Sequence, residues 1–312
     1  MSHTNRPTRR TRDLVVGVDG TPASANALRY AVKEAALSGG NVEVVHVIPD
    51  YAPIAGMYPI APAELVEAGR AALETTLREV GSTSGATLAT KLERGAVVKT
   101  LVTAGEHALE IVVGSDRRPV TSRLLTGNVS TGVAASAAVP VVSVPETWSA
   151  DRETGTVLVG VKRPDQSEAL LAEGFEVARR RGSRLVVLRA WRFPSAYDDI
   201  IVSDPATLAE WGDRARSELE DLVAPWRHSY PDVEVELRCV HDHPAQALVH
   251  ASVDADELVI ARKAHGFPAA AHLGSTARTT LLYAHCPVRV VPAVHVPVLP
   301  DLDLEAAGSA LK

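Results

Sequence analysis

The fold is decided by LVVGVDGTPAS, residues 14–24, an apolar run that ends in an acidic turn containing glycine. The same arrangement returns, loosely, as VLVGVKRPDQS at residues 157–167. A second motif, VPVVSVP at residues 139–145, returns as CPVRVVP at residues 286–292. The offset is 143 residues from Gly17 to Gly160 and 147 from Pro140 to Pro287. Because solenoid repeats have periods of about 20–50 residues, this spacing indicates a duplicated domain instead.

Length and composition fit two globular domains. The 312 residues divide into two units near the common domain size, and the 46% hydrophobic content can fill a core in each. A net charge of −6 without a basic face argues against a nucleic-acid partner. No apolar run is long enough to span a membrane. The two cysteines, Cys239 and Cys286, lack metal-site spacing, which favours a reducing cytoplasm.

Each repeat alternates short β-branched runs with longer helical patterns, which predicts α/β architecture with parallel sheets. The predicted strands are 13–19, 42–48, 87–92, 109–114 and 139–144, then 156–162, 184–190, 233–239, 257–261 and 287–292. The predicted helices are 23–38, 63–81, 96–106 and 127–137, then 165–181, 204–229, 244–253 and 274–284. The predicted organisation is a disordered leader (1–12), a first repeat (13–146), a linker (147–155), a second repeat (156–297) and a flexible tail (298–312).

Candidate binding residues follow the first and fourth strands of the first repeat. In an open parallel sheet, ligands bind beyond the carboxyl ends of strands where the strand order reverses. Asp19-Gly20-Thr21 follows strand one, Gly114 to Arg117 follows strand four, and Gly127 to Ser130 opens the last helix. Glycines let the backbone approach a phosphate, and the first amides of a helix offer free donors to an anion. Both parts of an adenine-nucleotide site are therefore present.

These residues resemble the tandem form of the universal stress protein family, over residues 13–145 and 156–292. Nucleotide-binding members carry Gly, two residues, Gly, nine residues, Gly, then Ser or Thr. Gly114 and Gly127 keep the family's first and last glycine positions, while Arg117 replaces the middle glycine and Asn128 the final Ser/Thr. In the second repeat the same frame holds Ala261, Ala264, Gly274 and Ser275.

The resemblance implies a Rossmann-like, five-stranded sheet of order 3-2-1-4-5 in each repeat. It also implies ATP, AMP or ADP as ligand of the first repeat, with Mg²⁺ as a companion that Asp116 could assist. The cofactor-binding residues expected there are Asp19, Gly20, Thr21, Val47, Val113, Gly114, Arg117, Gly127, Asn128, Val129 and Ser130. A weaker second site would use Ala261, Gly274, Ser275 and Thr276, with Lys162 in place of the strand-one acid.

Three functions are compatible with these residues. The first is a nucleotide-binding regulator of a cytoplasmic stress response, acting on an unknown protein partner. The second is a nucleotide-free, dimerising interaction module in which both sites have decayed. The third is a slow ATPase, although no catalytic residues can be identified.

The last strands carry a further expectation. The family's last strand commonly pairs domains, so residues 139–144 and 288–291 are predicted to join the two sheets as an internal pseudo-dimer, or to pair chains as a homodimer. His241, His243 and His250 do not show a zinc-site spacing, so we expect a solvated loop there and no metal. The apolar face of residues 204–229, which includes Trp211, is predicted to cover the sheet.

Overall fold

The computed structural model describes residues 11–50, 62–81, 85–115, 129–162, 167–193, 204–262 and 273–292. The first repeat contains strands β1 (Leu14–Gly17), β2 (Val42–Pro49), β3 (Leu88–Gly95), β4 (Glu110–Ser115) and β5 (Val141–Pro145), with helices α1 (Pro22–Ser38), α2 (Pro62–Val80), α3 (Val97–Ala104) and α5 (Val129–Ser136). The second repeat contains β6 (Thr156–Gly160), β7 (Arg184–Trp191), β8 (Val235–His241), β9 (Glu257–Ala261) and β10 (Val288–Val291), with helices α6 (Glu168–Arg181), α8 (Pro205–Ser229), α9 (Pro244–Ala251), the 3₁₀ turn η2 (Ser252–Asp254) and α10 (Ser275–Tyr283).

Local chemistry explains where the main helices begin and end. Thr21 caps α1 by accepting a hydrogen bond from Ser24 N, and Gly39 ends that helix with a φ of 68°. Asp204 caps α8 by accepting from Ala206 N, with Pro205 in the first turn, as the sequence predicts.

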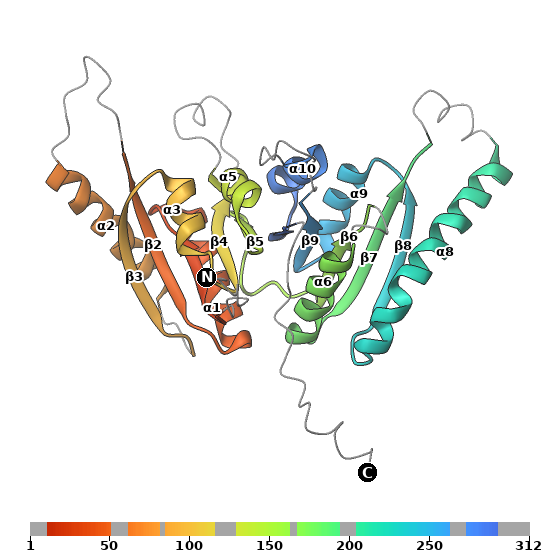
Figure 1. The fold of residues 1–312 in the computed structure, drawn as a ribbon, viewed down its shortest axis with the longest axis horizontal. Coiled ribbons are helices and arrows are strands. Elements are labelled where there is room, and N and C mark those ends of the chain that lie inside the picture. Colours follow the sequence, from red (N-terminus) through yellow and green to blue (C-terminus); the bar gives the residue numbers. More distant parts are fainter. Residues whose placement is uncertain are drawn as a thin grey trace, which may run out of the picture.

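The strands form one sheet of ten, in the order β3-β2-β1-β4-β5-β10-β9-β6-β7-β8. Each repeat therefore has the expected order 3-2-1-4-5 with parallel pairing throughout. At the centre β5 and β10 run antiparallel, with Val142 opposite Arg289 (Figure 1). The predicted pairing of the last strands is confirmed. This pairing joins the two five-stranded sheets into one continuous sheet.

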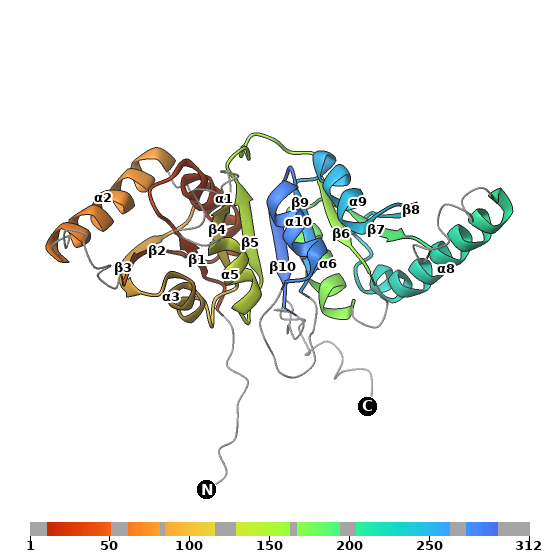
Figure 2. The same cartoon turned by 90° about the horizontal axis from the view of Figure 1, so that it is seen from above.

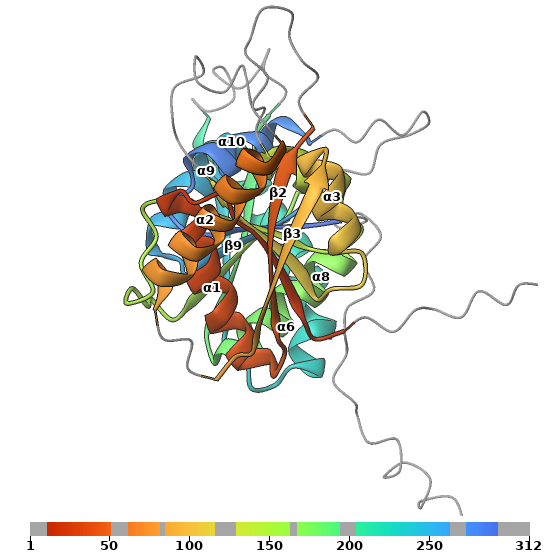
Figure 3. The same cartoon turned by 90° about the vertical axis from the view of Figure 1, so that its left-hand side faces the viewer.

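Helices cover both faces of the sheet. Helices α5 and α10 lie side by side over β5 and β10, as the view from above shows (Figure 2). Figure 3 shows α1 and α2 on one side of β2 and β3, and α3 on the other. The apolar core on the α3, α5, α9 and α10 face is continuous between the repeats. On the α1 and α6 face the cores are two separate clusters.

The amphipathic helix α8 covers the sheet with only part of its predicted face. Ala215, Leu219 and Val223 are buried, whereas Trp211 is 44% exposed. The Trp211 ring instead contacts Phe193 at a centroid distance of 5.0 Å. The helix has 25 residues and the neighbouring strand β8 has seven. Even with a rise of about 1.5 Å per residue in a helix against about 3.3 Å in a strand, α8 is the longer element, and its first turns extend past the sheet.

The connection between repeats is held against α1. Asn26 Nδ2 donates to the carbonyls of Glu146 (2.8 Å) and Trp148 (2.9 Å), and the Trp148 ring meets Tyr30 edge-on at 5.7 Å. At the other end of the first repeat, Thr11 donates from its main-chain N to the His107 carbonyl at 2.9 Å, although the sequence assigns Thr11 to the leader.

Candidate functional site

The first repeat has a switch point between β1 and β4, which are neighbours in the sheet. The chain leaves β1 toward β2 on one side and leaves β4 toward β5 on the other. A crevice at the carboxyl ends of such strands is where open α/β sheets bind ligands. Most of the described residues expected to bind nucleotide lie at this edge.

The turn after β1 is held by its own side chains. Asp19 Oδ1 accepts hydrogen bonds from Thr21 N (3.1 Å) and Thr21 Oγ1 (2.6 Å). Gly20 between them has a φ of 81°, a left-handed conformation that favours glycine. Asp19 itself is exposed. The predicted short acidic turn therefore leads into a helix, α1, and one carboxylate oxygen of Asp19 is engaged within the turn.

Gly114 lies where the end of β4 touches the first turn of α1. A Cβ added there would come within 2.6 Å of Ala23 C, 2.7 Å of Ala23 O and 2.8 Å of Ser24 N. These are backbone atoms, so only glycine fits without a shift of the helix. The contact fixes the two strand ends and the start of α1 as one unit.

Val47 and Val113 are buried side chains of the apolar core. The register pairs Gly17, the last residue of β1, with Val45, so the end of β2 from His46 onward passes beyond its partner. His46 Nδ1 is 2.8 Å from the Val18 carbonyl and donates to it, which ties β2 to the turn. Sequence reasoning missed His46; its position at the end of β2 was the available signal.

Helix α5 begins at the same edge of the sheet. Val129 is half-buried and Ser130 is 3% exposed, so the Ser130 side chain lies within the packed part of the helix. Gly132 keeps α5 close to α3, since a Cβ there would approach Val98 Cγ2 to 2.8 Å. Arg117, Gly127 and Asn128, which complete the expected phosphate turn, lie outside the described residues, as does Asp116.

The corresponding edge of the second repeat is built differently. Lys162 is exposed where the first repeat has Asp19, and Ala261 stands where the first has Gly114. Helix α6 begins at Glu168. Gly274 is the N-cap residue of α10 and, as a glycine, has no side chain to accept a capping hydrogen bond. Ser275 is exposed and Thr276 is half-buried. Ala264 lies outside the described residues.

Each repeat binds the end of a helix of the other, next to its own candidate site. Arg262, directly after Ala261, donates from Nη1 to the carbonyls of Ala134 (3.2 Å), Ala135 (2.8 Å) and Ala137 (2.8 Å) at the C-terminus of α5. Ser115, directly after Gly114, donates from Oγ to the Leu281 carbonyl of α10 at 3.3 Å. A guanidinium at a helix C-terminus satisfies free carbonyls and complements the helix dipole. The second repeat therefore holds the helix whose N-terminus faces the candidate site.

Replacing Arg262 with methionine should loosen α5. We expect the free energy of unfolding to fall by about 1–2 kcal/mol, because three carbonyls lose a charged donor. Hydrogen exchange measured by mass spectrometry should accelerate in α5. The same change at the exposed Arg278 of α10 is the control and should leave α5 unchanged. Equal exchange in both variants would contradict this role for Arg262.

Chemically, this edge of the sheet offers main-chain groups, hydroxyls and one carboxylate. Among the described residues no three His, Cys, Asp or Glu side chains gather to hold a metal ion. Within the same residues, no helix combines the length and hydropathy needed to cross a membrane. Glycines and main-chain groups of this kind are what allows a backbone to approach an anionic ligand closely.

Comparison with known proteins agrees with this architecture. The model of the Universal stress protein family matches residues 10–145 and again 153–292. A universal stress protein of Mycolicibacterium smegmatis is 32% identical over 289 residues, covering 89% of this chain and 96% of that protein. One from Mycobacterium tuberculosis is 32% identical over 295 residues, covering 89% and 95%. The crystal structure of a universal stress protein from Archaeoglobus fulgidus has a TM-score of 0.65 at 18% identity, covering 90% of this chain and 96% of that one. The chain therefore belongs to the universal stress protein family and carries two copies of its domain.

Proposed function

We propose that the first repeat binds ATP, or AMP or ADP, and that the protein acts as a nucleotide-dependent regulator of a cytoplasmic stress response. The nucleotide would lie in the crevice between β1 and β4, its phosphates against the backbone near Gly114 and the start of α5. Binding would change the surface presented to a protein partner. Mg²⁺ enters only as a companion of the phosphates.

The single observation that carries this proposal is the contact between Gly114 and the first turn of α1. A Cβ at Gly114 would clash with Ala23 and Ser24, so the strand end, the helix start and the Asp19 turn are brought together at one edge. Backbone amides and glycines arranged in this way are a common means of holding phosphate. The part of β2 that passes beyond β1 at Val47 adds main-chain groups for the base.

The second repeat supports the assignment of the site to the first. Ala261 adds a methyl group at the position of Gly114, and Lys162 offers a cation at the position of Asp19. Arg262, the next residue, is engaged with the carbonyls of α5. Family membership makes a nucleotide a reasonable ligand, and these differences favour one site per chain.

ATP should stabilise the protein. At about 100-fold excess over the dissociation constant, one bound nucleotide adds about 2.7 kcal/mol to the free energy of unfolding. A thermal-shift titration with ATP, ADP and AMP measures this. Mass spectrometry of the gently purified protein identifies a nucleotide that is already bound.

The matched variants are Asp19→Ala and Lys162→Ala, which occupy equivalent positions in the two repeats. We expect Asp19→Ala to weaken binding about tenfold, or about 1.4 kcal/mol, because the turn loses its two internal hydrogen bonds. Lys162→Ala should bind as the wild type does. No shift with any nucleotide and none co-purifying would favour the nucleotide-free interaction module instead.

A further inference from the structure

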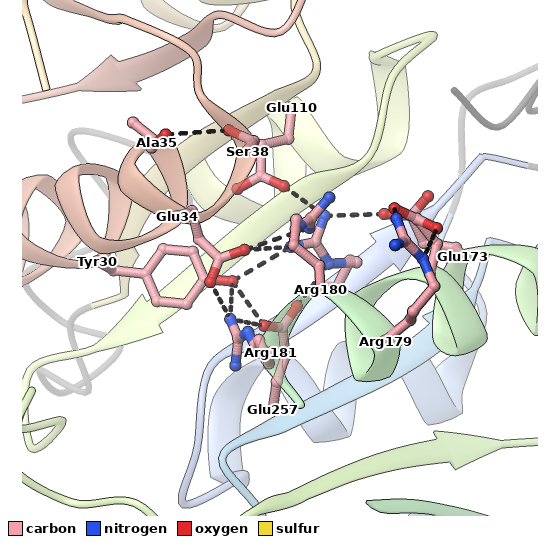
Figure 4. Close-up of polar contacts among 12 residues, drawn as sticks. Tyr30, Glu34, Ala35, Ser38, Glu110, Glu173, Arg179, Arg180, Arg181 and Glu257 are labelled. Carbon is pink, nitrogen blue, oxygen red and sulfur yellow. Dashed lines mark hydrogen bonds and ion pairs between the residues drawn. The ribbon is translucent and has the colours of Figure 1, made fainter. Parts of the chain in front are cut away.

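A cluster of buried charges lies where the two repeats meet on the α1 and α6 face of the sheet. Figure 4 shows side chains of α1 and α6 converging with carboxylates of the strands between them. The seam cluster, as we call it, consists of Tyr30, Glu34, Glu110, Glu173, Arg180, Arg181, Glu257 and Arg289. It fills the gap between the two separate apolar cores on this face.

Arg289 of β10 is the centre of the cluster and is 0% exposed. Its Nε donates to Glu257 Oε1, and its Nη1 donates to Glu110 Oε2 and, at 2.9 Å, to Glu173 Oε1. Its Nη2 donates to Tyr30 Oη at 3.2 Å and lies 3.8 Å from Glu34 Oε2. One guanidinium thus meets five side chains from four elements.

The remaining pairs join α1 to α6 and to β9. Arg181 Nη2 is 2.6 Å from Glu34 Oε1 and also donates to Tyr30 Oη at 2.8 Å. Arg180 Nη2 donates to Glu34 Oε2 at 3.3 Å, and Tyr30 Oη donates to Glu257 Oε2 at 2.6 Å. Most of these pairs bridge the two repeats.

The two repeats contribute unlike charges. The first repeat supplies the carboxylates of Glu34 and Glu110 and none of the guanidiniums in the cluster. The second supplies three guanidiniums, on Arg180, Arg181 and Arg289, and the carboxylates of Glu173 and Glu257. The equivalent position of Arg289 in β5, 147 residues earlier, is Val142, which faces it across the seam.

We propose that the seam, the junction of β5 with β10 and the helices beside them, is an interface for unlike repeats only. The first repeat of this chain pairs with a second repeat, from its own chain or another copy, and does not pair with a first repeat. The backbone pairing alone would not discriminate, because main-chain groups pair whatever the side chains are, and β5 and β10 are both short strands, largely apolar, whose only charged residue is Arg289. The charges decide which pairs form.

In the same register, neither a pair of two first repeats nor a pair of two second repeats would be stable. Two first repeats would bury Glu34 and Glu110 of both copies with no guanidinium from either in the cluster. Two second repeats would place Arg289 directly opposite Arg289, since Val142 and Arg289 occupy the same register position. Like charges directly opposite in a sheet are destabilising, and an unpaired buried charge is more so.

Stability alone does not account for such a cluster. Replacing a buried ion network with well-packed apolar side chains is often neutral or stabilising, whereas a buried charge that loses its partner is costly. A buried charged network therefore adds little stability, but it strongly disfavours a partner that lacks the matching charges. The opposite face of the seam, where the core is continuous and apolar, supplies the attraction.

One carboxyl group of the cluster, Glu110, favours its protonated form. It contains four carboxylates and three guanidiniums, and Glu110 Oε1 has no hydrogen-bond partner among the described residues. Burial raises the pKa of Glu110 from 4.5 to about 7, although Arg289 beside it favours the charged form, as does Arg180; Glu34 and Glu257 oppose it. Protonation of Glu110 therefore reduces the excess negative charge of the cluster as the pH falls below about 7.

This proton predicts a pH dependence. The unfolded chain releases it near pH 4.5 and the folded chain near pH 7, so this group's contribution to stability falls as the pH rises between those values. Burial raises the pKa of Glu34, but Arg181 and Arg180 lower it by more, so the net pKa is below its usual value. Protonation of Glu34 therefore affects stability only below that pH range. The urea midpoint of Glu110→Gln minus that of the wild type should therefore rise as the pH is raised from about 4.5 to about 7. A constant difference would contradict the protonation of Glu110.

The pairing rule can be tested on the full chain with a cleavable linker. Residues 149–151 are exposed, so a protease recognition sequence is inserted between Ala150 and Asp151 and cut after folding. Cut protein with and without ¹⁵N labelling is mixed, taken through a urea step and returned to buffer, and the pairs are counted by native mass spectrometry. We expect only unlike pairs, with label exchanged between them.

A second variant assigns the rule to Arg289. Arg289→Val gives β10 the residue of β5, and in this cut variant we expect pairs of two second repeats to appear. The control is Arg179→Val on α6, whose side chain pairs with Glu176 near the surface. This variant should still form unlike pairs only. Like pairs of the wild-type halves in amounts comparable to unlike pairs would overturn the proposal. Halves that separate or aggregate after cleavage would overturn it as well.

Discussion

Arg289→Met is expected to lower the free energy of unfolding by about 3–5 kcal/mol. Removing one partner of a buried ion network leaves uncompensated charge in the interior, and here Glu110, Glu173 and Glu257 all lose the same guanidinium. The loss should be smaller at acidic pH, because protonation neutralises the carboxylates left behind. Urea unfolding followed by tryptophan fluorescence measures both effects.

The matched control is Arg179→Met on α6. Arg179 pairs with Glu176 at 2.8 Å, but its side chain is 43% exposed. An ion pair of this kind contributes about 0–1 kcal/mol, so the control should unfold nearly as the wild type does. If Arg289→Met cost less than about 1 kcal/mol, the seam cluster would not hold the buried charges that its geometry indicates.

Gly114→Ala is the second large effect we expect, at about 2–3 kcal/mol of destabilisation. The new methyl group would have to push the first turn of α1 away from β4, because the atoms it meets are backbone and cannot rotate aside. The same shift would open the proposed nucleotide crevice. The variant should therefore lose the thermal shift with ATP as well as stability.

The same substitution at Gly212 should have the opposite sign. Gly212 lies within α8, and an added Cβ would meet only Trp191 Cζ2, at an ordinary 3.6 Å. Alanine is preferred over glycine in a helix interior by about 1 kcal/mol, so Gly212→Ala should be neutral or stabilising. Gly114→Ala behaving like Gly212→Ala would show that the approach of β4 to α1 is looser than described.

Most of the fold could be predicted from local patterns. Apolar β-branched runs such as residues 111–113 and 185–188 indicate strands covered on both faces, and the regular alternation with helices fixes a parallel sheet. The pairing of β5 with β10 was predicted from the family resemblance. The exposure of Trp211 was not, because periodicity gives the face of a helix and not the length of sheet beneath it.

The candidate site was predicted in part. Asp19, Gly20, Thr21 and Gly114 are brought to one edge, while Val47, Val113 and Ser130 have buried side chains. The seam cluster was missed altogether, because its members are scattered from Tyr30 to Arg289 and each is ordinary in its own segment. A usable signal was present: Arg289 interrupts CPVRVVP, a strand whose pattern otherwise requires burial on both faces.

The continuous sheet has a consequence for colloidal behaviour. Because β5 pairs with β10, neither is an edge strand to which a further strand could add. The edge strands of the joined sheet are β3 and β8. Both borders carry charge, Lys91, Glu93 and Arg94 on β3 and Glu236 and Arg238 on β8. Charged border strands resist growth of a sheet from molecule to molecule. The duplication therefore protects the protein from polymerising through its sheet.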